Sequence, residues 1–155
     1  MTFRTKAEGG EQAFSHPEYL AFLRLILDTD CADLLDIEFF TAGADLPALV
    51  EQAHSAGITV VCSSHDFAKT PPRAELVSRM VQMQQAGADL PKLAVMPQCR
   101  TDVLELLAAT AEMADLHPET PVITMSMGAL GAVSRLAGEA FGSAMTFANP
   151  GQASA

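Results

Sequence analysis

The stretch DLPKLAVMPQ, residues 89–98, carries one ammonium group inside an apolar run that Pro97 closes. Side chains at positions i and i+2 of a strand share a face, so Lys92 points the same way as Leu90 and Ala94. A lysine at a frayed strand start, with its head in water, explains this equally well. The chemical alternative is a Schiff-base nucleophile, because an apolar pocket lowers the pKa of an ammonium group and frees the amine.

The segment VVCSSHDFAKTP, residues 60–71, ends a predicted strand at His65. Barrel enzymes collect their active-site side chains at the carboxyl ends of strands. An imidazole there can act first as a base and then as an acid near neutral pH, although a structural histidine is the open alternative. Cys62 lies three residues earlier and therefore faces the other side, so we expect no Cys–His dyad.

Charged residues on two predicted strands form a possible ion-pair group. Arg4 ends TFRT, residues 2–5, and Glu8 lies in the loop that follows. Asp36 and Glu38 share one face of an otherwise apolar strand. Inward carboxylates are costly without a cation, and Arg4 on the neighbouring strand is the expected partner, in a structural or supporting role. Solvated charges are the alternative for Arg4 and Glu8.

Two other segments contain candidate binding residues. Arg135 stands among small and apolar residues in GAVSRLAGEAFG, residues 131–142. It lies either on a helix surface or in a partly enclosed site, where its guanidinium would bind a carboxylate through two hydrogen bonds. Met125 and Met127 share a strand face and line the core or a pocket.

Apolar strand-like runs alternate with amphipathic helical runs, which predicts a parallel sheet covered by helices. A repeat of about 30 residues without a glycine-rich phosphate motif favours a (β/α) barrel over a dinucleotide-binding sheet. A closed eight-stranded barrel takes about 250 residues, so we expect residues 1–155 to form one incomplete barrel domain. Six predicted strands occupy residues 2–5, 34–40, 58–64, 90–97, 121–127 and 143–148.

The composition restricts the function classes. The chain has 155 residues, of which 49% are hydrophobic, and its net charge of −10 argues against nucleic acid as a partner. Cys31, Cys62 and Cys99 are widely separated, which predicts free thiols and no metal site. The sequence shows neither a signal peptide nor an apolar run long enough to cross a bilayer. We therefore expect a soluble cytoplasmic protein without a membrane partner.

These residues resemble the type I 3-dehydroquinate dehydratase family along essentially the whole chain. The resemblance rests on TFRTKAEGGEQA, DIEFF, SSHDFAKTP, LPKLAVMPQ, VITMSMG, SRLAGEAFGSAMTF and QASA. It implies a (β/α)8 TIM barrel, here with strands three to eight of the family. It also implies that the protein needs no metal or cofactor to dehydrate 3-dehydroquinate to 3-dehydroshikimate in the shikimate pathway.

The resemblance implies a role for each matching residue. The lysine matching Lys92 forms an imine with the C3 ketone. The histidine matching His65 removes a C2 proton and then helps the C1 hydroxyl to leave, and the glutamate matching Glu8 orients that histidine. The remaining matches surround the substrate: Arg135 holds its carboxylate, Arg4 contacts it, Ser154 belongs to a closing loop, and Met125, Met127 and Phe147 line the pocket wall.

Departures from the family pattern lead to further expectations. The first two βα units and the last helix of the family are missing, which leaves two open sheet edges. Open edges invite association, so we expect a homo-oligomer such as a dimer, or an open and marginally stable barrel. The alternative function is a non-catalytic barrel remnant that binds a carboxylate ligand or another chain. A different Schiff-base lyase, such as an aldolase, is a weaker alternative.

Overall fold

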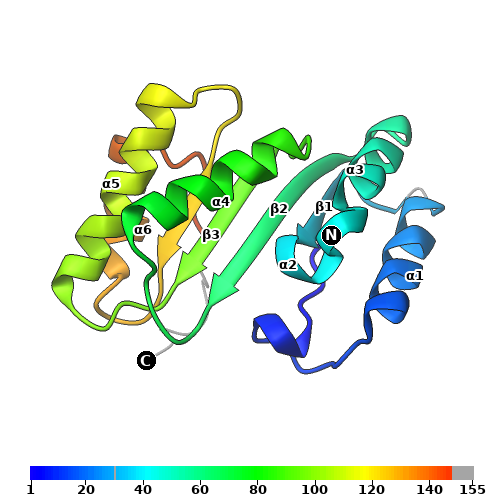
Figure 1. Ribbon diagram of the computed structural model, residues 1–155, viewed down its shortest axis with the longest axis horizontal. Coiled ribbons are helices and arrows are strands. Elements are labelled where there is room, and N and C mark those ends of the chain that lie inside the picture. The colour runs from blue at the N-terminus through cyan, green and yellow to red at the C-terminus, as the bar shows by residue number, and fades with distance from the viewer. Residues whose placement is uncertain (30, 148–155) are drawn as a thin grey trace.

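The computed structural model describes residues 1–29 and 31–147 and contains a sheet of four parallel strands (Figure 1). The strands follow one another in the order of the sequence, and a helical connection joins each to the next. This arrangement is the repeating unit of a (β/α) barrel. The strands are β1 (Leu34–Glu38), β2 (Thr59–Asp66), β3 (Leu90–Val95) and β4 (Ile123–Ser126).

Helices cover one face of this sheet. Prolines in the first turn start α1 and α3, where the missing amide hydrogen costs nothing. The carboxylate of Glu18 also accepts hydrogen bonds from the amide and hydroxyl of Ser15 at the start of α1. The helices are α1 (His16–Leu27), α2 (Phe39–Ala42), α3 (Leu46–Ser55), α4 (Arg73–Gln85), α5 (Arg100–Leu116) and α6 (Ala132–Ala137), with short 3-10 turns η1 (Lys6–Glu8), η2 (Gly43–Asp45) and η3 (Gly138–Phe141).

The two faces of the sheet have different surroundings. On the helix-facing side, alternate strand residues join the buried residues of α1, α3, α4 and α5 in one large hydrophobic cluster. On the opposite, barrel-facing side, the buried hydrophobic cluster contains only Val61, Ala94, Ile123 and Met125. Cys62 belongs to the helix-facing cluster, which confirms that it points away from His65. The barrel-facing side is therefore where the polar residues of the strands gather.

The first and last of the six predicted strands are shorter than expected. Residues 2–5 and 143–148 are predicted as strands, but within the described residues each pairs with the sheet region through one parallel bridge, Thr2 to Asp36 and Ser143 to Val122, and Thr5 forms a further bridge with Gln12. Side chains replace the missing main-chain pairs: the amide of Thr5 donates to Glu38 Oε1, and the amide of Thr124 donates to the hydroxyl of Ser143. The predicted order of segments is nevertheless correct.

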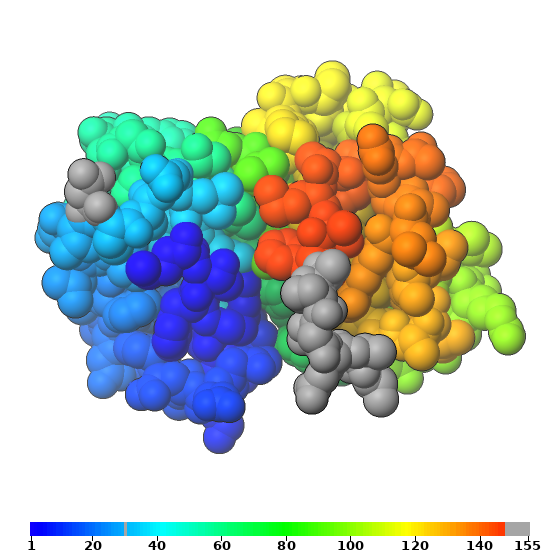
Figure 2. Space-filling view, turned by 180° about the vertical axis from the view of Figure 1, so that it is seen from behind, coloured from blue at the N-terminus to red at the C-terminus, as the bar shows by residue number. Residues whose placement is uncertain are grey.

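The two outer segments lie on the face of the molecule opposite to the view of Figure 1. Figure 2 shows this face, with the N-terminal residues in dark blue left of its centre and the residues just before position 148 in red near its centre. Across the described ranges, no helix is both long and apolar enough to span a membrane. The cysteines at positions 31, 62 and 99 are free thiols, as the sequence predicts.

Candidate active site

Lys92 lies on β3 and points to the barrel-facing side. Its ammonium group is buried, with 4% of the residue exposed, and Nζ donates to Asp36 Oδ2 over 2.9 Å. The ring centroid of Phe147 lies 4.6 Å from Nζ, in cation–π contact. A lysine with its head in water is therefore excluded. The burial expected from the sequence is confirmed, but an acidic partner and an aromatic ring also contact the nitrogen, which the sequence alone does not predict.

Asp36 is the anion that pairs with this lysine, and it does so across a strand. Asp36 lies on β1 and Lys92 on β3, and the small side chain of Ser63 on β2 lies between them. Ser63 donates to Asp36 Oδ1, while Arg4 donates to Oδ2 over 2.7 Å. Burial alone would raise the pKa of the Asp36 carboxyl, but the positive charges of Lys92 and Arg4 outweigh it and hold this pKa below its usual value. Asp36 is thus a stable carboxylate.

Arg4 connects the carboxylates of the site. One terminal nitrogen donates to Asp36, and the other donates to Ser63 Oγ over 2.7 Å and to Glu38 Oε1 over 3.4 Å. The same nitrogen lies 3.7 Å from Glu8 Oε2. Burial opposes the charged form, but the three acids outweigh it and raise the pKa of Arg4. The predicted pairing of Arg4 with Asp36 and Glu38 is confirmed.

Glu38 ties the N-terminal segment to β1. Its carboxylate accepts from the amide and hydroxyl of Thr5 and from the hydroxyl of Thr41. Its own amide donates to the hydroxyl of Tyr19 over 2.8 Å, and Tyr19 is fully buried. Buried polar groups with complete hydrogen bonding fix one arrangement of their segments. This network therefore holds Arg4 in place.

His65 pairs with Glu8 near the carboxyl end of β2. Nδ1 lies 2.8 Å from Glu8 Oε2, and Glu8 comes from the η1 turn, so the contact joins segments far apart in the chain. Burial and the nearby charge of Glu38 raise the pKa of Glu8, while His65 and Arg4 oppose that rise. With Nδ1 engaged by the carboxylate, Nε2 is the ring nitrogen available for proton transfer.

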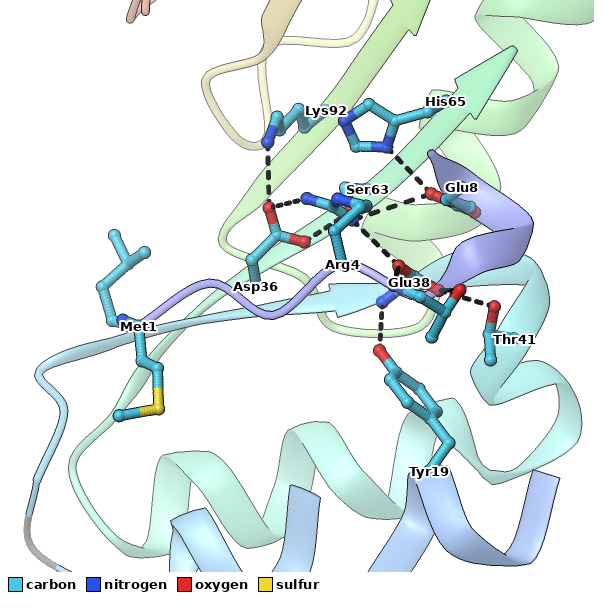
Figure 3. Close-up of polar contacts among 12 residues, drawn as sticks. Met1, Arg4, Glu8, Tyr19, Asp36, Glu38, Thr41, Ser63, His65 and Lys92 are labelled. Atoms are coloured by element: carbon cyan, nitrogen blue, oxygen red, sulfur yellow. Dashed lines mark hydrogen bonds and ion pairs between the residues drawn. The ribbon is translucent and has the colours of Figure 1, made fainter. Parts of the chain in front are cut away.

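The lysine and the histidine lie on the same face of neighbouring strands. In the register of β2 and β3, Ser63 is opposite Lys92 and His65 is opposite Ala94. Figure 3 shows the two side chains above a group formed by Arg4 and Asp36. An amine that can attack a carbonyl carbon and an imidazole that can remove a proton beside that carbon are thus adjacent.

The remaining candidate residues are placed differently. Met125 is buried in the barrel-facing cluster, and Met127 packs against it. Phe147 is exposed but reaches Lys92. Arg135 is exposed on α6 and lines a hollow of about 350 Å³ between α6 and residues 143–146; within the described ranges it has no salt bridge. The structure does not bring it to Lys92. Ser154 lies outside the described residues.

The pairing of Asp36 with Lys92 was missed from the sequence. The signal was an inward acid on one strand, a small polar residue on the next and an inward lysine on the third. Reading it requires the register, which places Asp36 opposite Val61 and Ser63 opposite Lys92. Alternation of apolar and polar residues specifies the face of a side chain but leaves the stagger between strands undetermined.

Parallel strands joined by helices, with charged side chains of neighbouring strands gathered on the inner face, define part of a (β/α) barrel with a candidate active site at that face. The family model of type I 3-dehydroquinase matches residues 1–155, and the chain belongs to this family.

Individual relatives agree with this assignment. The 3-dehydroquinate dehydratase of Salmonella agona (strain SL483) is 49% identical over 155 residues, which is 100% of this chain and 62% of the relative. The crystal structure of the type I enzyme from Clostridium difficile with covalently modified comenic acid matches with a TM-score of 0.91 at 48% identity, over 97% of this chain and 61% of that one. The structure of 3-dehydroquinate dehydratase from Enterococcus faecalis gives a TM-score of 0.90 at 50% identity, over 94% and 60%. The chain thus spans less than two thirds of the length of these relatives.

Proposed function

We propose that this chain carries the catalytic centre for dehydration of 3-dehydroquinate to 3-dehydroshikimate. Membership of the type I 3-dehydroquinase family supports the reaction. The observation that carries the proposal is the position of Lys92, buried on the inner face beside the strand that bears His65 and its partner Glu8. The reaction proceeds through an imine between the substrate and this lysine.

In the first stage, the ammonium of Lys92 passes one proton to His65, and the neutral Nζ adds to the C3 carbonyl carbon of the substrate. The carbonyl oxygen takes one proton from Nζ and the other back from His65, and leaves as water. The product is a protonated imine, which carries the same single positive charge as the original ammonium group. Asp36, 2.9 Å from Nζ, therefore faces a cation before and after this stage. Its fixed negative charge stabilises the iminium that must accept electrons in the next stage.

In the second stage, His65 removes a proton from C2. The electron pair of the C2–H bond moves into the iminium and gives an enamine. The enamine then returns its electrons to expel the C1 hydroxyl, which takes the proton from His65 and leaves as water. Water hydrolyses the resulting conjugated imine and frees the amine of Lys92. Glu8 holds Nδ1, so Nε2 carries the proton in both directions.

The other family matches surround the substrate in this proposal. Met125, Met127 and Phe147 form the wall of the pocket, and Ser154 belongs to the closing loop. Arg135 binds the substrate carboxylate, which requires its exposed guanidinium on α6 to turn toward the barrel-facing side. Arg4 contacts the substrate only through the exposed part of its guanidinium, because both terminal nitrogens already donate to groups of the site.

The proposal extends to the setting of the reaction. The product serves aromatic biosynthesis through the shikimate pathway, or quinate breakdown by the same elimination. The three free thiols support a cytoplasmic location, and the two outer segments, each joined to the sheet region by one bridge, support assembly as a homodimer. Covalently modified comenic acid in the Clostridium difficile relative supports a nucleophile in the shared pocket.

Borohydride trapping tests the imine directly. The protein is mixed with 3-dehydroquinate and sodium borohydride. Its intact mass then reports how many adducts form, and peptide mapping locates the modified residue. We expect one adduct on Lys92, because borohydride reduces an imine to a stable secondary amine. Lys92→Arg keeps the charge beside Asp36 and should abolish the adduct, whereas Lys69→Arg at an exposed lysine should leave it unchanged.

Absence of an adduct on folded protein would contradict this proposal and favour a barrel remnant that only binds ligands. The folded state is checked separately by circular dichroism and by the cooperativity of urea unfolding. An adduct that persists in Lys92→Arg would assign the nucleophile to another lysine. A phosphate-bearing aldolase substrate serves as the negative control, and trapping of that substrate would favour a different Schiff-base lyase.

A further inference from the structure

Phe67 is an aromatic side chain that lies outside both hydrophobic clusters. It follows the active-site histidine by two positions and is 49% exposed. Exposure of a phenyl ring to water costs free energy, and the buried part of this ring makes two specific contacts.

One contact is with the backbone of Gly9. A methyl group added to Gly9 would lie 2.3 Å from Phe67 Cζ and 2.5 Å from Cε2, so the tip of the ring rests directly against the Cα of this glycine. Gly9 has φ of 90° and immediately follows Glu8. Glycine meets both requirements at this position, the left-handed backbone and the close approach of the ring.

The second contact is with the imidazole of His65. The two rings are nearly parallel, with an interplanar angle of 16° and centroids 6.3 Å apart. The ring of Phe67 therefore spans from the residue that follows Glu8 to the imidazole that Glu8 binds.

The turn that carries Phe67 is itself fixed. Asp66 Oδ1 accepts hydrogen bonds from the amides of Ala68 and Lys69 over 2.9 and 3.0 Å. The carbonyl of Asp66 accepts from the amide of Met96 at the end of β3. Three successive residues thus have separate roles: His65 faces the site, Asp66 fixes the turn after β2, and Phe67 contacts the residue that follows the η1 turn.

We propose that Phe67 is a positioning residue that holds the η1 turn against the end of β2 and thereby maintains the Glu8–His65 hydrogen bond. That bond joins residues 57 positions apart. The packing of Phe67 on Gly9 limits how far the η1 turn and the end of β2 can move apart, and such a movement would break the hydrogen bond. The importance of this role for catalysis rests on the proposed function, but the contact itself does not.

The experiment compares two disruptive variants with two matched controls, without substrate. Phe67→Ala removes the ring, and Gly9→Ala inserts a methyl group into it. Phe40→Ala removes another exposed phenyl ring, and Gly57→Ala imposes the same strain at φ of 75° where nothing lies within 4 Å. The readouts are the rate at which diethyl pyrocarbonate modifies His65, with exposed His54 as internal standard, and the rate at which the His65 Nδ1–H proton exchanges with solvent, measured by NMR.

We expect both disruptive variants to accelerate modification of His65 about fivefold, the effect of weakening a charge-assisted hydrogen bond, and both controls to stay near wild type. Exchange of the His65 Nδ1–H proton with solvent should accelerate by about the same factor, because the carboxylate of Glu8 holds this proton less closely. In a Glu8→Gln background, Phe67→Ala should no longer change this exchange rate. This last result separates positioning through Glu8 from simple shielding of the ring.

The proposal is overturned if Phe67→Ala leaves the exchange rate of the His65 Nδ1–H proton unchanged, or changes it equally with and without Glu8. Phe67→Leu keeps an apolar side chain and provides the same test with a smaller change if Phe67→Ala does not fold. Borohydride trapping at Lys92 is measured in parallel on each variant. Failure of wild type to trap substrate would refute the proposed function, while the His65 readouts would still decide the role of Phe67.

Discussion

The two faces of the sheet are built on different principles. On the helix-facing side, β1, β2 and β3 contribute apolar residues to a large cluster with α1, α3, α4 and α5. On the barrel-facing side, the same strands contribute Asp36, Glu38, Ser63, His65 and Lys92, and only a small apolar cluster lies beside them. Alternation along each strand places the two kinds of residue one position apart.

This difference separates stability from chemistry within the same strands. Apolar burial on the helix-facing side is favourable and tolerates no charge. The barrel-facing side buries several charges, which is unfavourable unless each has a partner. It meets that condition with Arg4, which contacts three carboxylates, and with the pairing of Lys92 to Asp36. The helix-facing side therefore supports the fold, while the barrel-facing side depends on complete pairing.

The largest effect should come from breaking that pairing at Asp36. Asp36→Asn keeps the size of the side chain but leaves Lys92 and Arg4 without their shared anion. Removing one partner of a buried ion pair costs about 3–5 kcal/mol, so we expect a loss of this size in the free energy of unfolding. Urea unfolding followed by circular dichroism measures it.

Asp45→Asn is the control for this substitution, because the Asp45 side chain is partly exposed and, among the described residues, has His16 as its one ion-pair partner. Exposed pairs contribute about 0–1 kcal/mol. A similarly small loss for Asp36→Asn would show that the barrel-facing network contributes little to stability and would remove the contrast between the faces.

Two isoleucines allow the apolar parts of the faces to be compared at equal side-chain size. Ile37 on the helix-facing side and Ile123 on the barrel-facing side are both 0% exposed. Ile37→Ala should cost about 3–4 kcal/mol, and Ile123→Ala at least about 1 kcal/mol less, because the smaller cluster can collapse around the lost atoms. Equal losses in urea unfolding would show that the small cluster is packed as firmly as the large one.

The face of each side chain could be predicted from the sequence. Alternation along the strands predicts that Lys92 shares a face with Leu90 and Ala94, and that Asp36 shares a face with Glu38. It also predicts that Cys62 points away from His65. The structure has each of these as predicted. Alternating strands and helices also predicted the parallel sheet and the order of its segments.

Contacts that depend on register or on loops could not be predicted. Asp36 reaches Lys92 across an intervening strand, which requires the stagger of three strands. The packing of Phe67 on Gly9 joins two turns for which no periodic pattern exists. The outer segments were predicted as full strands because residue type shows strand preference but not the loss of main-chain pairs to side chains such as Glu38.

A smaller effect is expected at Tyr19, where the two faces meet. Its ring belongs to the helix-facing cluster, while its hydroxyl accepts a hydrogen bond from the amide of Glu38. Tyr19→Phe keeps the ring and leaves a buried amide without an acceptor, which costs about 1–3 kcal/mol. Urea unfolding measures the loss, and hydrogen exchange at the Glu38 amide should accelerate.

Ser55→Ala provides the comparison for this hydroxyl, because Ser55 donates to the carbonyl of Glu51 on the exposed face of α3. A loss in Tyr19→Phe no larger than in Ser55→Ala would indicate that water or another group replaces the lost acceptor. The barrel-facing network would then be less dependent on the helix-facing side than its geometry indicates.

The smallest effect is a change in how stability depends on pH. It involves two carboxylates whose pKa values shift in opposite directions on folding. The pKa of Asp36 is lowered in the folded state, so its contribution is present above its unfolded pKa and is lost as pH falls through the folded value. The pKa of Glu8 is raised, chiefly by burial, so its contribution is full below its unfolded pKa of about 4.3 and is lost as pH rises through the folded value. Glu8→Gln removes only the second of these.

We therefore expect the unfolding free energy of Glu8→Gln, relative to wild type, to increase as pH rises from about 4 toward 7. Below that range both proteins carry an uncharged side chain at position 8, and their difference should be constant. Urea unfolding at intervals of pH measures both profiles, and Glu11→Gln, at an exposed glutamate in the same segment, should follow wild type. Parallel profiles for Glu8→Gln and wild type would mean that His65 and Arg4 fully compensate the burial of Glu8. The barrel-facing side would then hold its charges at no net cost, and the contrast with the helix-facing side would lie in composition alone.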